Sequence, residues 1–153
     1  MEKIQLDEIV HPELLVVDSE ATNKAEILNE LGTLLHEKGY IKNVRAFLDD
    51  VYLREEEGET GIGQGIAIPH GKSPAVSTTT VAIATLKEGI EWETLDEQEV
   101  KVVILFAVKD SDANTTHILL LQQIAILLAN DQFIKQIKEV QTKEELFDLI
   151  TNY

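Results

Sequence analysis

An almost unbroken apolar run in the second half of the chain limits its fold more than any other feature. Residues 100–108 read VKVVILFAV, with Lys101 as the single charged residue. A strand with one face in water alternates apolar and polar residues, whereas a strand covered on both faces does not. The run therefore predicts a central strand with cover on each side. Its uninterrupted part, residues 102–108, is far shorter than the roughly 20 residues of a membrane-spanning helix.

Helical patterns precede and follow this strand. Apolar residues recur at helical spacing in five segments, which predict helices at residues 22–38, 43–56, 116–130, 132–139 and 143–152. Short apolar or β-branched runs predict two more strands, at residues 65–68 and 78–86, and a polar bend is expected at 110–115. The predicted fold class is α/β, with residues 1–153 forming a single domain whose mixed β-sheet is flanked by helices on both sides.

Charge and cysteine content exclude several function classes. The chain has 13 Lys+Arg against 28 Asp+Glu, a formal charge of −15, which disfavours nucleic-acid binding. It has no cysteine, which excludes disulfides, thiolate catalysis and cysteine-ligated zinc, and no metal-ligand cluster is recognisable. The first residues, MEKIQLDE, do not resemble a secretory signal, so we expect a cytoplasmic protein that is not inserted in a membrane.

A glycine-rich segment is the first candidate site. Four of the eight glycines fall between positions 61 and 71. The segment fails as a nucleotide-binding loop, since Ile66 stands where a glycine is required and Pro74 follows where a helix should begin. What remains is His70, just beyond the predicted short strand, with Pro69 and Gly71 expected to leave its imidazole open to a partner. The alternative is a structural turn with an incidental histidine.

Two further residues are candidates on weaker patterns. His117 lies on the apolar face of the 116–130 helix near its N-terminus, where it is either a packed core residue or an imidazole beside an anion site. Arg54 precedes the glycine-rich segment and either binds a phosphate or pairs with Asp50 on the helix surface. The acidic residues 55–57 and Glu59 are expected to form a solvated face or a docking patch for a basic partner.

Residues 54–72 carry a more specific pattern. The segment REE at 54–56, followed by TGIGQGIAIPHGK at 60–72, resembles the signature of the fructose/mannitol-type enzyme IIA domains of the bacterial sugar phosphotransferase system. The resemblance extends over nearly the whole chain, including GIEW at 89–92 and THIL at 116–119.

That resemblance implies a cytoplasmic phosphocarrier. It would accept a phosphoryl group from the histidine-containing phosphocarrier protein and pass it to a cysteine of an enzyme IIB domain, while a fructose-like sugar enters through an associated membrane permease. By the same resemblance, His70 is the phosphorylated histidine, His117 is the second active-site histidine and Arg54 helps to hold the phosphoryl group. Thr60 and Gln64 are expected to line the site, without a cofactor or metal.

Two alternatives follow from the same residues. Nitrogen-type regulatory paralogs of enzyme IIA are similar in their histidine loop and act by phosphorylation-dependent binding to other proteins, so the motif does not separate regulation from transport. A histidine-dependent hydrolase is disfavoured, because the sequence has no G-x-S-x-G elbow and no cysteine.

Overall fold

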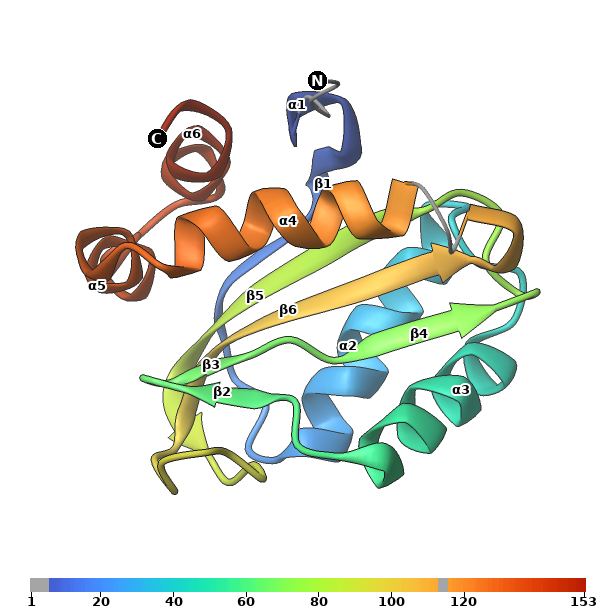
Figure 1. Ribbon diagram of the computed structural model, residues 1–153, viewed down its shortest axis with the longest axis horizontal. Helices are drawn as coiled ribbons and strands as arrows, with labels where there is room; N and C mark the ends of the chain where they lie inside the picture. Colours follow the sequence, from blue (N-terminus) through green and yellow to red (C-terminus); the bar gives the residue numbers. More distant parts are fainter. Residues whose placement is uncertain (1–5, 113–115) are drawn as a thin grey trace.

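A six-stranded mixed sheet lies between two helical layers in the computed structural model, which describes residues 6–112 and 116–153. The elements in chain order are α1 (Leu6–Ile9), β1 (Val10–Ser19), α2 (Lys24–Glu37), α3 (Val44–Glu57), β2 (Gly61–Gly63), β3 (Ile66–Ala67), β4 (His70–Ser73), β5 (Thr80–Ile90), β6 (Val100–Lys109), the 3-10 turn η1 (Asp110–Asp112), α4 (Thr116–Leu128), α5 (Asp131–Glu139) and α6 (Lys143–Asn152). Helices α2 and α3 lie on one side of the sheet and α4 on the other (Figure 1). The predicted fold class is confirmed.

The sheet has the strand order β1-β5-β6-β3-β2, with β4 also paired to β6. Strands β5 and β6 are antiparallel, whereas β1 is parallel to β5 and both β3 and β4 are parallel to β6. Because Ile66 pairs with Val102 and His70 pairs with Phe106, β3 and β4 follow one another along the same edge of β6. This edge positions the glycine-rich segment.

Strand β6 separates two hydrophobic cores. Alternate residues along it pack toward α2 and α3, as Leu105 does, or toward the C-terminal helices, as Phe106 does, and all of residues 102–108 are buried. Helix α3 contributes Phe47 to the first core, and α4 contributes Leu120 to the second. The predicted double cover of this strand is confirmed.

The structure differs from the sequence-based expectations in several strands, and the short strand β2 was not predicted. Strand β1 was not predicted; it lies at the sheet edge, where Pro12 can be accommodated despite its missing N–H. Strand β5 continues to Ile90, beyond the predicted end. The predicted strand at 65–68 shortens to β3, and His70 begins a second strand, β4, where an isolated strand end was expected.

Predicted and observed helix boundaries differ by at most two residues. Helix α2 begins at Lys24 because Asn23 is its N-cap and accepts a hydrogen bond from the Glu26 N–H at 2.9 Å. Of the predicted polar bend, residues 110–112 form η1, and residues 113–115 lie outside the described part of the chain. No single helix within residues 6–112 and 116–153 is long and apolar enough to cross a membrane; α4 and α5 together have the length and composition but are bent by 91°.

Candidate active site

The backbone of β4 determines the direction of the His70 side chain. His70 pairs with Phe106 on the parallel strand β6, so both side chains point to the same face of the sheet, toward α4. The ring centroids of His70 and Phe106 are 4.9 Å apart, at an interplanar angle of 31°. The imidazole is therefore half-buried against an aromatic ring instead of free in solvent.

Gly71 points to the opposite face, and its lack of a side chain lets α3 approach β4. A Cβ at this position would lie 2.7 Å from Val51 Cγ2 and 2.9 Å from Phe47 Cζ, closer than real Cβ atoms are found. The expectation that Gly71 leaves the imidazole open to a partner is therefore wrong. Its role is to seat β4 against the helix that carries Arg54.

His117 comes to the same place from the other side. It lies in the first turn of α4, and the ring centroids of His70 and His117 are 5.5 Å apart in an edge-to-face arrangement of 67°. Among the described residues, neither His70 Nδ1 nor His117 Nε2 has a hydrogen-bond partner, although both atoms are buried. Buried polar atoms are normally paired, so two such nitrogens on neighbouring rings make this pair the candidate site.

Both imidazoles are held in their neutral forms. Burial, followed by the charges of His117 and Arg54, lowers the pKa of His70 from 6.5 to about 4. Burial and then the charge of Lys72 lower the pKa of His117. A neutral imidazole keeps a lone pair on one nitrogen, so at pH 7 both rings are able to act as nucleophile or hydrogen-bond acceptor.

Arg54, on α3, carries a positive charge that acts on His70. It lies in the last turn of the helix, where its Nη1 donates a hydrogen bond to the Gly58 carbonyl at 3.3 Å. No ion pair with Asp50 occurs within the described part of the chain, so the alternative of a surface pair is not supported. The guanidinium charge remains available for an anion.

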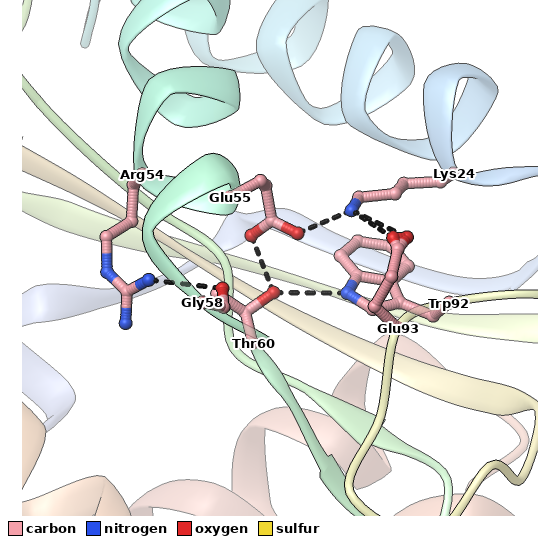
Figure 2. A network of polar contacts seen from close by, with 7 residues as sticks. All are labelled: Lys24, Arg54, Glu55, Gly58, Thr60, Trp92 and Glu93. Carbon is pink, nitrogen blue, oxygen red and sulfur yellow. Dashed lines mark hydrogen bonds and ion pairs between the residues drawn. The ribbon is translucent and has the colours of Figure 1, made fainter.

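Next to Arg54, the Glu55 side chain is buried in a polar network formed by Lys24, Glu55, Thr60, Trp92 and Glu93, which we call the Glu55 network (Figure 2). Lys24 Nζ lies 2.5 Å from Glu55 Oε1, and the Thr60 hydroxyl donates to Glu55 Oε2 at 2.6 Å. The expectation of a solvated acidic face is wrong for Glu55, while residues 56, 57 and 59 are exposed.

The two other residues expected to line the site make their hydrogen bonds to other groups. Thr60 is 2% exposed and is occupied by Glu55 and by Trp92, whose Nε1 donates to its hydroxyl at 3.1 Å. Gln64 is exposed in the turn between β2 and β3, where its N–H donates to Asp96 at 2.9 Å. This turn adjoins the start of β6, whereas His70 pairs near the end of that strand.

Comparison with known proteins identifies the family of this chain. The family model described as phosphoenolpyruvate-dependent sugar phosphotransferase system, EIIA 2, matches residues 8–153. The chain belongs to this EIIA 2 family. Components of this kind are phosphotransferase carriers, so the predicted enzyme class is confirmed.

Relatives of the EIIA 2 domain include both sugar-transport and regulatory proteins. The chain is 35% identical, over 96% of its length, to the PTS system 2-O-α-mannosyl-D-glycerate-specific EIIABC component of Escherichia coli. It is 29% identical, over 98% of its length, to the fructose-specific EIIABC component of Bacillus subtilis. The chain spans 22% and 24% of these two proteins. The crystal structure of nitrogen regulatory protein IIA-Ntr from Neisseria meningitidis is similar with a TM-score of 0.84, at 27% identity, over 94% of this chain and 97% of that one.

Lys72 is a further cation near the candidate site, and it was not among the residues predicted from the sequence. It lies two residues after His70 on β4 and pairs with Val108, so it projects from the same face as His70. Its charge contributes to the lowered pKa of His117. The alternation of side chains along a strand is the signal that could have identified it.

Proposed function

We propose that His70 is a phosphoryl carrier, which accepts the group from the histidine-containing phosphocarrier protein and donates it to a cysteine of an enzyme IIB domain. The observation that supports this proposal is the pair of half-buried imidazoles, each with a buried, unpartnered nitrogen, at a ring separation of 5.5 Å and acted on by the Arg54 charge. The EIIABC designation of the Escherichia coli relative supports a IIB acceptor.

The chemistry needs positioning and charge neutralisation more than a strong base. A lone pair on a His70 nitrogen attacks the phosphorus, the bond from phosphorus to the donor imidazole breaks, and its electron pair returns to the donor ring. Arg54 neutralises charge on the equatorial oxygens, and His117 is close enough to His70 to hydrogen-bond one of them. Transfer to IIB repeats the step, with the cysteine thiolate as nucleophile and the His70 imidazole as leaving group.

The acidic surface supports a transient complex with a basic partner. With a formal charge of −15, the chain attracts a donor that presents positive residues around its histidine, and association should slow as salt is added. We propose a fructose-like sugar as the transported substrate, as named for the Bacillus subtilis relative. The membrane permease would associate with this domain through IIB.

Regulation by phosphorylation-dependent binding is the second candidate. It is favoured by the likeness to the Neisseria meningitidis nitrogen regulatory protein, which covers 97% of that chain. Transfer from the phosphorylated domain to a IIB protein separates the two functions, because only the transport component must pass the group on.

Phosphoryl transfer in a reconstituted mixture tests the carrier function. Enzyme I, the histidine phosphocarrier, phosphoenolpyruvate and this protein are combined, and its intact mass is measured beside that of His70→Ala. We expect one acid-labile phosphoryl group on the wild type and none on the variant. An unmodified wild type beside a fully phosphorylated donor would refute the proposal.

A further inference from the structure

The Glu55 network connects the glycine-rich segment to the rest of the fold, yet none of its members takes part in the transfer step. We propose that this network is a positioning device, which holds Arg54 in place for the phosphoryl group. The inference rests on the proposed carrier function of His70, because that function gives Arg54 its anion.

Three separate segments of the chain meet at one carboxylate, and a fourth joins them through Thr60. Glu55 is in the last turn of α3, Lys24 begins α2, Thr60 precedes β2, and Trp92 lies in the connection between β5 and β6. The Glu55 side chain is only 7% exposed. A buried carboxylate with partners from such distant segments fixes their relative positions.

The network also keeps a negative charge away from Arg54, its neighbour in the chain. Lys24 occupies Glu55 Oε1 and Thr60 occupies Oε2, so both carboxylate oxygens are satisfied without the guanidinium. Figure 2 shows the Arg54 and Glu55 side chains leaving α3 in different directions. An arginine free of a carboxylate partner retains its charge for a phosphoryl oxygen.

The segment between α3 and β2 transmits this order to Arg54. Within it, the Gly58 carbonyl accepts from Arg54, and two residues later the Thr60 hydroxyl is held by Glu55 and Trp92. The next residue, Gly61, donates its N–H to the Glu93 carbonyl at 3.2 Å. The carbonyl that holds Arg54 is thus fixed by the helix on one side and by the network on the other.

Thr60→Val tests the inference, with Asp49→Asn as control. Valine has nearly the shape of threonine but loses both hydrogen bonds, while Asp49 is an exposed carboxylate on the same helix, outside the acidic residues 55–59. We expect the rate of phosphoryl transfer to His70 to fall about tenfold in Thr60→Val, since displacement of a positioning group by about 1 Å costs up to about 100-fold. The control should match the wild type.

Two further readouts separate positioning from general destabilisation. Because the Arg54 charge lowers the pKa of His70, NMR titration should show a higher His70 pKa in Thr60→Val than in the control. In an Arg54→Gln background, Thr60→Val should cause no further loss of rate, because the group through which the network acts is gone. Trp92→Phe removes only one of the hydrogen bonds and serves as the milder variant if Thr60→Val folds poorly.

Different outcomes would refute the positioning role of the Glu55 network and the carrier function of His70. A lower melting temperature in Thr60→Val with the control's transfer rate and His70 pKa would overturn the positioning role, as would an equal loss of rate with and without Arg54. If the wild type and Asp49→Asn both accept no phosphoryl group, the carrier function fails, and the His70 titration alone then decides whether the network positions Arg54.

Discussion

Acidification from pH 7 to pH 5 should destabilise the protein through His70. The folded state holds the His70 pKa at about 4, against 6.5 for the free side chain. Between these values the unfolded chain binds the proton and the folded chain does not, so this contribution to stability is lost as the pH falls from about 6.5 to about 4, and nothing changes above that window. At about 1.4 kcal/mol per pKa unit, the loss is about 2 kcal/mol at pH 5 and about 3 kcal/mol at pH 4.

Urea unfolding of the wild type and of His70→Gln at pH 7 and pH 5 measures this contribution. Glutamine does not titrate, while the carboxylates and His117 are common to both proteins. With a urea dependence of about 2 kcal/mol per M, the wild-type midpoint should fall by about 1 M more than that of the variant. Equal pH dependence in the two proteins, or an NMR titration of His70 centred near pH 6.5, would refute the reasoning.

Three substitutions test other parts of the site. Gly71→Ala should lower the melting temperature by about 2–12 °C, because overpacking against Val51 and Phe47 costs about 1–3 kcal/mol and each kcal/mol is worth about 2–4 °C at this size; calorimetry showing no change would contradict this packing. Lys72→Gln should raise the pKa of His117 by removing a nearby cation, and NMR titration would show the same value as the wild type if the ammonium lies elsewhere. Arg54→Lys should slow phosphoryl transfer to His70 about tenfold or more, since the bidentate guanidinium is lost; a wild-type rate would contradict its role.

Local patterns in the sequence predict most of the secondary structure of this fold. The apolar run at 100–108 predicted a doubly covered strand, and β6 is one, because burial on both faces requires apolar residues at every position. Strand β1 was missed because Pro12 and Glu13 break its alternation. It is a strand through its pairing with β5, 67 to 71 residues away, as in Val10 with Val81.

The candidate site was predictable only in part, for a similar reason. His70, His117 and Arg54 were selected by a family motif, and no local spacing brings two imidazoles from β4 and α4 to 5.5 Å. The burial of Glu55 is set by Lys24, which lies on another helix, so an acidic run in the sequence looks solvated.

Strand β4 presents His70 to one hydrophobic core and Gly71 to the other. The imidazole proposed to carry the phosphoryl group therefore belongs to one layer of the molecule, while Arg54, proposed to bind that group, belongs to the opposite layer, on α3. Side chains in one layer can be substituted during evolution without a compensating change in the other layer, provided that residue 71 remains glycine. Gly71 thus sets the distance between β4 and α3, and with it the spacing between the two halves of the candidate site.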